Sequence, residues 1–262
     1  MAARLKIAGL RAASILVLIL LWWAASLAVH DPDVLPGPAA VARTIVADFQ
    51  KPGPEGESAF FDVGITLVRI FVAFAAAMVA GIGIGLAMGL NRTCERSLLA
   101  LIPLLLTMPT ILMVFLAIMW FGYSESGSLV AVMAVVTPYV AVNMYEGTKA
   151  MDKSLIEMGV TFRASQRLLL RKVYLPQLMP YIFAAFRYAF GATWKIVALA
   201  ETFGLKFGIG YMFFFWFQQF DMTQVLSWII MFVVLMLILE HGLFARIESR
   251  AFAWRRAAMA RA

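Results

Sequence analysis

Long apolar runs separated by short polar connections make up most of the chain. A bilayer core needs about 20 mostly apolar residues for each helical crossing. Six stretches reach that length, near residues 11–29, 64–90, 98–121, 127–147, 177–200 and 224–244. The pattern predicts an all-α polytopic membrane protein, a single domain over residues 1–262, with six transmembrane helices. The second stretch is rich in glycine, and small residues let another helix approach closely. We therefore expect the face with Gly81, Gly83, Gly85 and Gly89 to contact protein rather than lipid.

Composition agrees with a membrane protein. The chain is 63% hydrophobic and 14% charged, whereas soluble domains are roughly half apolar and about a quarter charged. A net charge of +7 raises the question of a nucleic-acid partner. Lys and Arg fall in short clusters between apolar runs, as in cytoplasmic loops, so we expect no nucleic acid. Cys94 is the single cysteine, and His30 and His241 are far apart in sequence, so no metal site is expected.

The distribution of Lys and Arg predicts the orientation in the membrane. These residues gather at both termini and in the second and fourth connections, whereas the opposite side carries only Arg43, Lys51 and Lys206. Because positive residues favour the cytoplasmic side, we expect both termini in the cytoplasm. The basic start and Ser26-Leu27-Ala28 are also compatible with a cleaved signal peptide. A long apolar run and Trp22-Trp23 at its end favour an uncleaved helix instead.

The first outer connection, about residues 30–63, is rich in Pro, Gly and acidic residues and is too polar to span a membrane. Within it, Ala39 to Phe49 has apolar residues at helical spacing, namely Val41, Ile45 and Phe49. We therefore expect a short surface helix there.

A charged segment of about thirty residues, 148–176, lies between the fourth and fifth apolar stretches. We expect one short helix from Asp152 to Gly159, with acidic residues where the helix dipole favours them. Ser165 can cap a second amphipathic helix, Gln166 to Tyr174. We expect Pro176 to end it, because proline has no N–H to donate to the preceding turn.

The spacing in this segment is informative. Glu157-Met158-Gly159-Val160-Thr161-Phe162-Arg163, followed by Val173-Tyr174-Leu175-Pro176, resembles the E-A-A-x3-G-x9-I-x-L-P loop of ABC-importer permeases. Further ordered matches are similar to the nitrate, sulfonate, taurine and bicarbonate branch of that superfamily; they are Leu35-Pro36-Gly37-Pro38, Thr66-Leu67-Val68-Arg69, Trp120-Phe121-Gly122, Asn143-Met144-Tyr145-Glu146-Gly147, and Ala200-Glu201 with Gly208-Ile209-Gly210-Tyr211.

Two positions depart from the family pattern. Arg163 stands where the family has a glycine that allows a turn with positive φ, and Met158 replaces the first alanine. An arginine in that conformation carries a steric cost. Either the turn is made elsewhere, as at Gly159, or Arg163 is helical and contacts the ATPase.

The resemblance implies the six-helix fold of type I ABC-importer permeases in a bacterial inner membrane. It implies a homodimer in lipid that binds two copies of a cytoplasmic ATPase and receives substrate from a periplasmic binding protein. The permease would then be no enzyme and hold no cofactor, with ATP and Mg²⁺ on the ATPase. The absence of G-x4-G-K-[ST] from the chain agrees. The residues implied in ATPase coupling are Glu157, Met158, Gly159, Arg163, Leu175 and Pro176.

Ionisable residues inside the apolar stretches are functional candidates, because burying charge in a membrane is costly. We expect Arg69 to snorkel to the outer surface and Arg187, near mid-depth, to have a structural pairing role. Lys195 beside Trp194 is expected either to line an anion path or to pair with Glu201. Prolines 103, 109 and 138 indicate kinked helices with free carbonyls. The predicted pathway residues are Thr107, Met108, Thr110, Thr137, Arg187, Trp194 and Lys195.

The leading functional hypothesis is import of a small anion such as a sulfonate, nitrate, bicarbonate or organic acid. Import of a neutral heterocycle or vitamin precursor by the same machinery is the close alternative. A proton-coupled secondary transporter is a different class, which would be expected to show internal repeats and mid-membrane carboxylates, and neither is evident. A membrane enzyme would be expected to cluster His, Asp or Glu at one interface, and the sequence shows no such cluster.

Overall fold

The computed structural model describes residues 2–240 and 242, with the side chains of residues 2–8, 11 and 12 excepted. His241 and the basic C-terminal residues that entered the predicted orientation lie outside this range. The described residues form helices joined by short connections, and an isolated bridge between Pro52 and Ser58 is their one extended pairing. The helices are α1 (Ala2–Val29), α2 (Pro38–Asp48), α3 (Ala59–Leu90), α4 (Arg92–Leu98), α5 (Leu101–Thr107), α6 (Thr110–Phe121), α7 (Glu125–Lys149), α8 (Lys153–Thr161), α9 (Gln166–Leu169), the π-helical turn η1 (Leu170–Tyr174), α10 (Leu175–Gly204), α11 (Ile209–Gln218) and α12 (Met222–Leu239). The all-α prediction is confirmed.

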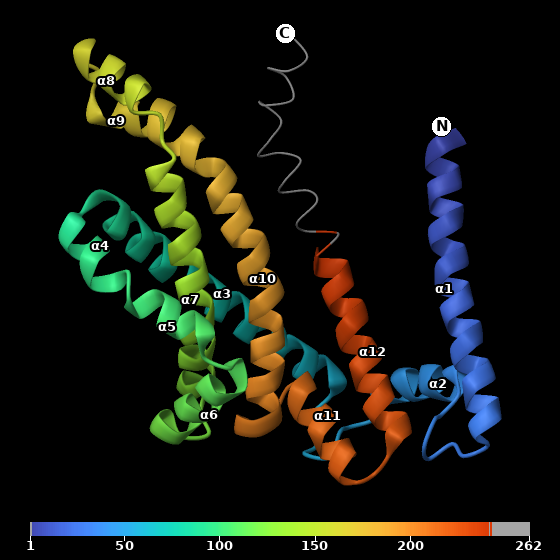
Figure 1. Ribbon diagram of the computed structural model, residues 1–262. Coiled ribbons are helices and arrows are strands. Elements are labelled where there is room, and N and C mark those ends of the chain that lie inside the picture. The colour runs from blue at the N-terminus through green and yellow to red at the C-terminus, as the bar shows by residue number, and fades with distance from the viewer. Residues whose placement is uncertain (1, 241, 243–262) are drawn as a thin grey trace.

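Helices α3, α7 and α10 form the centre of the bundle, with α6, α11 and α12 around them (Figure 1). Their buried side chains make one continuous apolar core that includes Ile70, Val140, Val197 and Trp228. Helix α1 stands apart from this bundle and packs mainly against α2 (Figure 1). The starts of α1 and α10 and the end of α12 lie toward one side of the molecule, and α2 and α11 lie at the other (Figure 1).

Small residues let α3 and α7 approach closely. A Cβ added to Gly81 would lie 2.5 Å from Val140 Cβ, and one on Gly85 would lie 2.5 Å from Met144 Cβ. A Cβ on Gly89 would meet Thr148 in the same way, whereas one on Gly83 would meet nothing within 4 Å. The predicted protein contact is thus confirmed for the three glycines spaced four residues apart.

Four helices in the described part of the chain are long and apolar enough to cross a membrane, namely α3, α7, α12 and the continuous helix Gln166–Gly204. The predicted span 98–121 is a broken helix, and the kink expected at Pro109 is confirmed. Residues Arg92–Thr107 and Thr110–Phe121 are bent by 103° relative to each other. Pro109 has no N–H and disfavours the helical conformation of Met108, whose ψ of 131° is extended. The apolar part of α1 with described side chains, Ala13–Val29, is shorter than a full span.

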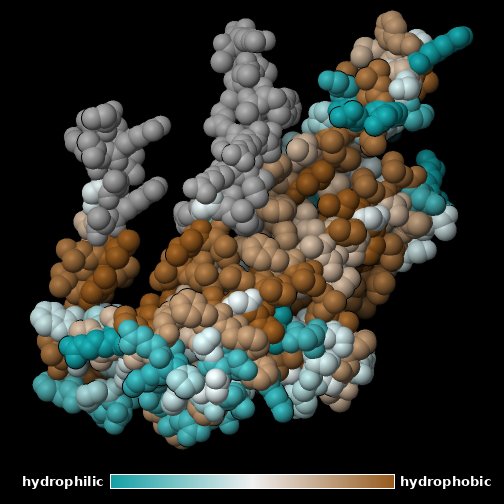
Figure 2. Space-filling view, turned by 180° about the vertical axis from the view of Figure 1, so that it is seen from behind, coloured by the Kyte–Doolittle hydropathy of each residue, from teal (hydrophilic) through white to brown (hydrophobic). Residues whose placement is uncertain are grey.

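The surface agrees with a membrane-embedded bundle. Figure 2 shows a wide apolar belt between a polar lower edge and a polar projection at the upper right. At the polar lower edge, α2 is the surface helix that Val41, Ile45 and Phe49 predicted. Val41 is 1% exposed, and the Phe49 ring lies 4.7 Å from that of Phe60. Trp22 of α1 donates to the Pro36 carbonyl at 3.1 Å, which joins α1 to the connection before α2.

Candidate functional site

The charged segment folds as two short helices that project beyond the bundle (Figure 1). Asp152 caps α8 by accepting hydrogen bonds from the Ser154 hydroxyl (2.7 Å) and backbone N–H (2.8 Å). These bonds, led by that from the side chain, lower the pKa of Asp152 below its ordinary value. The Asp152 N–H donates to Gln177 Oε1 at 2.7 Å, so the start of α8 is tied to the start of α10.

The turn after α8 is made at Arg163 itself. Its φ of 52° is in the left-handed region, where the family pattern has glycine. The Arg163 N–H donates to the Val160 carbonyl (2.9 Å), and the Ala164 N–H donates to the Gly159 carbonyl (3.0 Å). This pair of bonds is the Schellman arrangement that closes many helices. Both expected solutions are therefore wrong: the backbone turn is kept, and arginine carries its steric cost.

Gly159 is needed for packing rather than for the turn. A Cβ at this position would collide with the Leu169 side chain, which is 2% exposed between the two helices. Small size at residue 159 therefore lets α8 lie directly against α9.

The expected helix end at Pro176 is wrong. The chain continues from α9 through η1 into α10 without interruption. In η1 the Leu175 N–H donates to the carbonyl of Leu170, five residues earlier. Pro176 then lies in the first turn of α10, where a missing N–H and the fixed φ of proline are tolerated.

The projecting helices expose apolar side chains as well as charge. Met158 is 51% exposed and Phe162 is 79% exposed. Exposed apolar surface of this kind is typical of contacts with another protein or with a membrane surface. Sequence reasoning named Met158 and missed the others, although their helical spacing beside Glu157 was a usable signal; they are Leu155, Val160, Phe162, Leu168 and Leu170. Of the predicted coupling residues, Glu157 and Leu175 are also exposed, and Pro176 is half-buried.

A second candidate site is a cavity of about 380 Å³ between α6, α7 and α10. Arg187, Gly191 and Lys195 line it from one face of α10, because residues four apart share a helix face. The rings of Tyr139 and Tyr188 lie 4.4 Å apart at its wall. The full lining is Thr110, Val135, Tyr139, Arg187, Tyr188, Gly191, Ala192, Lys195 and Ile196.

The two cations of this cavity have no carboxylate partner among the described residues. Arg187 and Lys195 are both exposed in the single chain. Lys195 Nζ lies 5.3 Å from the centroid of the Trp194 ring, a cation–π contact. The expected pairing of Lys195 with Glu201 is wrong, because Glu201 pairs with Arg69. The pairing role expected of Arg187 is likewise not seen in the part of the chain that the structure describes.

The structure brings together only some of the predicted pathway residues. Thr110, Arg187 and Lys195 line the cavity, whereas Thr107, Met108, Thr137 and Trp194 do not. The Thr107 hydroxyl donates to Leu104 in its own helix, and Trp194 packs edge-on against Phe232 at 5.4 Å. Tyr139 and Tyr188 were missed; the position of Tyr188 beside Arg187 was the available signal.

A third cluster joins α3, α7, α10 and α11 at the opposite end of the bundle from α8. Arg69 is 8% exposed and contacts Glu201 at 2.7 Å and Glu125 at 2.6 Å. The Thr66 hydroxyl donates to Glu201 at 2.8 Å. The expectation that Arg69 snorkels is therefore wrong, because two carboxylates distant in sequence neutralise it inside the bundle.

The same cluster fixes the turn between α10 and α11 through backbone N–H groups. Gly208 donates to Asp62 Oδ1 (2.8 Å), Ile209 donates to Thr66 Oγ1 (3.0 Å), and Gly210 donates to Glu201 Oε2 (2.9 Å). Gly208 has a φ of 111°, which glycine adopts without strain. Two of the ordered sequence matches, residues 66–69 and residues 200–201 with 208–211, thus form one hydrogen-bonded unit.

Comparison with known proteins identifies the family of this chain. Residues 77–251 match the family model described as "Binding-protein-dependent transport system inner membrane component". The taurine transport system permease protein of Escherichia coli is 28% identical over 239 residues, which cover 91% of this chain and 86% of the relative. The formylaminopyrimidine transport permease protein of Halalkalibacterium halodurans is 29% identical over 245 residues, or 92% of this chain and 94% of the relative.

Solved structures agree on the fold. A chain of the MetNI methionine ABC transporter in an inward-facing conformation superposes with a TM-score of 0.63 at 18% identity, over 72% of this chain and 94% of that chain. The predicted type I importer permease fold is therefore confirmed. Membership implies a transport subunit of the inner membrane that works with an ATPase and a substrate-binding protein. The chain belongs to the family of binding-protein-dependent transport system inner membrane components.

Proposed function

We propose that this chain forms half of a translocation path for a small anion, in a homodimer whose path is lined by the cavity around Arg187 and Lys195. The observation that carries the proposal is two cations on an open face of α10 at membrane depth. Charged side chains exposed to lipid are costly, so this face meets water or a second copy of the chain. Two unpaired positive charges also lower the energy of an anion beside them.

Named relatives support the substrate class. Besides the taurine permease, they include a bicarbonate and a nitrate import permease of Synechococcus elongatus, 26% and 25% identical to this chain. A neutral heterocycle remains the second candidate, favoured by the formylaminopyrimidine permease and by the Tyr139–Tyr188 pair, which offers aromatic surface for stacking. Because the chain belongs to this family, we no longer propose a secondary transporter.

The projecting helices α8 and α9 are the proposed contact with the ATPase, one ATPase for each copy of the chain. Exposed Met158 and Phe162 supply apolar area, and Glu157 supplies a charge with no ion pair among the described residues. Lys and Arg near this end favour a cytoplasmic location for it and for both termini. In this arrangement ATP and Mg²⁺ are held by the ATPase.

The test is uptake of labelled taurine, methanesulfonate, nitrate, bicarbonate and formylaminopyrimidine by cells that express the complete importer. Arg187→Gln and Lys195→Gln should each lower uptake of the transported anion at least tenfold, while the ATPase still co-purifies. Lys206→Gln is the matched control, because Lys206 is exposed outside the cavity. Unchanged uptake in both cavity variants would refute the anion path. Uptake of formylaminopyrimidine alone, insensitive to Lys195→Gln, would establish the neutral alternative.

A further inference from the structure

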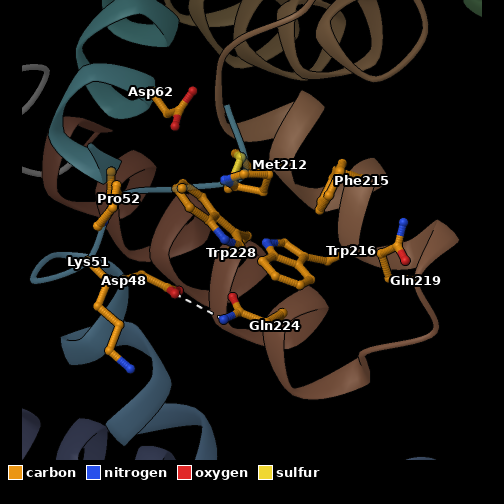
Figure 3. A pocket seen from close by; sticks show the side chains of 13 residues that line it. Asp48, Lys51, Pro52, Asp62, Met212, Phe215, Trp216, Gln219, Gln224 and Trp228 are labelled. Atoms are coloured by element: carbon orange, nitrogen blue, oxygen red, sulfur yellow. Dashed lines mark hydrogen bonds between the residues drawn. The ribbon is translucent and has the colours of Figure 1, made fainter. Parts of the chain in front are cut away.

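A separate cavity of about 460 Å³ opens between α2, the loop 51–58, α11 and α12 (Figure 3). This volume is in the range of small-molecule sites. The cavity shares no lining residue with the one around Arg187. Its walls carry aromatic and sulfur-containing side chains, chiefly Met212, Phe215, Trp216 and Trp228.

Three polar atoms in this wall have no hydrogen-bond partner in the described structure. They are the indole nitrogens of Trp216 and Trp228 and the amide oxygen of Gln224. Trp228 is 1% exposed, so its N–H is shielded from bulk water. In Figure 3 both indole nitrogens turn toward the space beside the Gln224 side chain. Buried polar groups are almost always paired, so three orphans around one cavity indicate an absent partner.

Asp48 determines what Gln224 offers to the cavity. The Gln224 Nε2 donates to Asp48 Oδ1 at 3.1 Å, and the Ser227 hydroxyl donates to Asp48 Oδ2 at 3.1 Å. An ionised carboxylate only accepts hydrogen bonds, so it holds the NH₂ group of Gln224 and leaves Oε1 as a fixed acceptor. Two donors, from Trp216 and Trp228, and one acceptor, from Gln224, therefore lie unpaired in the wall of the cavity.

The charge of the lining selects against anions. Asp48 and Asp62 both line the cavity, and Lys51 is its one cation. Asp62 is 3% exposed and already accepts from the Gly208 N–H, and Lys51 extends into solvent. An entering anion would approach two carboxylates, whereas a neutral molecule would not be repelled. The charged residues of this lining are mainly negative, whereas those of the Arg187–Lys195 cavity are positive.

We propose that the cavity between α2, α11 and α12 binds a small, neutral, planar molecule with adjacent C=O and N–H groups, such as a lactam, a cyclic urea or a pyrimidinone. Its carbonyl accepts hydrogen bonds from the indole N–H groups of Trp216 and Trp228, and its N–H donates to Gln224 Oε1. Its flat face packs on the aromatic wall. The site does not depend on which solute crosses the membrane, since it is lined by other residues.

The test measures binding of uracil, which is neutral at pH 7, to the full-length permease in lipid nanodiscs by titration calorimetry. We expect saturable binding with one uracil for each chain. 1,3-Dimethyluracil lacks the N–H donors and should bind at least tenfold more weakly. Trp228→Phe should weaken uracil binding at least tenfold, whereas Trp194→Phe, which changes an indole outside the cavity, should leave it unchanged. Arg187→Gln should also leave it unchanged, which separates this site from the translocation path.

Gln224→Met, of similar volume and without the amide acceptor, is the second variant should Trp228→Phe fail to fold. It should weaken uracil binding by a similar factor. Three results would overturn the proposal: no uracil binding, equal binding of the dimethyl compound, or displacement of uracil by methanesulfonate. Absence of uracil binding would mean that water alone pairs with the two indole N–H groups and the Gln224 oxygen.

Discussion

Removing the Glu201 carboxylate is the sharpest test of the buried cluster. Glu201 is 0% exposed and accepts hydrogen bonds from Arg69, Thr66 and Gly210. Glu201→Ala leaves the Arg69 guanidinium inside the bundle without its buried partner. Breaking a buried ion pair from one side costs about 3–5 kcal/mol. The Glu125 side chain is 61% exposed, so Glu125→Ala should cost only about 1 kcal/mol or less.

The assay is thermal unfolding of purified permease variants in one detergent, followed by tryptophan fluorescence. For a chain of this size, each kcal/mol shifts Tm by roughly 2–4 °C. Glu201→Ala should therefore lower Tm by about 10 °C, and Glu125→Ala by about 3 °C or less. Glu201→Gln keeps one acceptor oxygen, which at the Oε2 position can accept from both Thr66 and Gly210, and its Tm should fall between the two.

Equal Tm losses for the alanine variants at Glu201 and Glu125 would refute this reasoning. They would show that exposure does not set the strength of the two ion pairs. A Glu201→Ala variant within 2 °C of the native chain would show that water reaches Arg69 and pairs with it.

Three further predictions follow from single positions. Arg163→Gly should stabilise the end of α8 by about 1 kcal/mol, because glycine adopts positive φ freely. Amide hydrogen exchange at the end of α8 should therefore slow. Equal slowing in Arg163→Ala would show that relief of the positive φ is not the reason. Gly81→Ala should lower Tm by overpacking Val140, whereas Gly83→Ala should not; similar losses in both would count against the α3–α7 contact. Burial, partly offset by hydrogen bonds from Gln224 and Ser227, raises the pKa of the Asp48 carboxyl above its ordinary value of 3.8. The protonated form therefore stabilises the fold at low pH, and this stabilisation is lost as the pH rises from 3.8 through the folded-state pKa. The Tm advantage of Asp48→Asn over the native chain should therefore widen across that interval; a constant difference would exclude this titration.

Local sequence signals predicted local structure well. Asp152 and Ser165 start helices where capping residues should, and the spacing of Val41 in 38–48 located a surface helix. Proline was less informative. Pro109 ends a helix and Pro138 lies inside α7 without ending it. Packing of α7 against α3 and α10 decides the second case, and no local pattern contains those contacts.

In the candidate sites, too, features set by local spacing could be predicted from the sequence, whereas long-range contacts could not. The eight-residue interval between Arg187 and Lys195 places both on one broad helix face, so helical spacing was an available signal for their shared cavity, although the sequence analysis gave the two residues separate roles. The partners of Arg69 lie 56 and 132 residues away, and only the folded chain brings them together. Arg163 was identified as the unusual residue, but the sequence analysis expected a turn elsewhere or a helical Arg163 and did not predict that arginine itself would adopt the positive φ.

The uninterrupted helix from Gln166 to Gly204 is a single rod of 39 residues, about 58 Å long at 1.5 Å per residue. It has Leu169 near its start, Arg187 and Lys195 along its length, and Glu201 near its end. If the projecting helices contact the ATPase as proposed, a push on them would reach the opposite end of the bundle as tilt or torsion of one continuous helix, without a relay of side chains. In the five residues of η1 the backbone forms a wider π-helical turn. The stiffness of this turn therefore determines how much of a motion at one end of the helix reaches the other end.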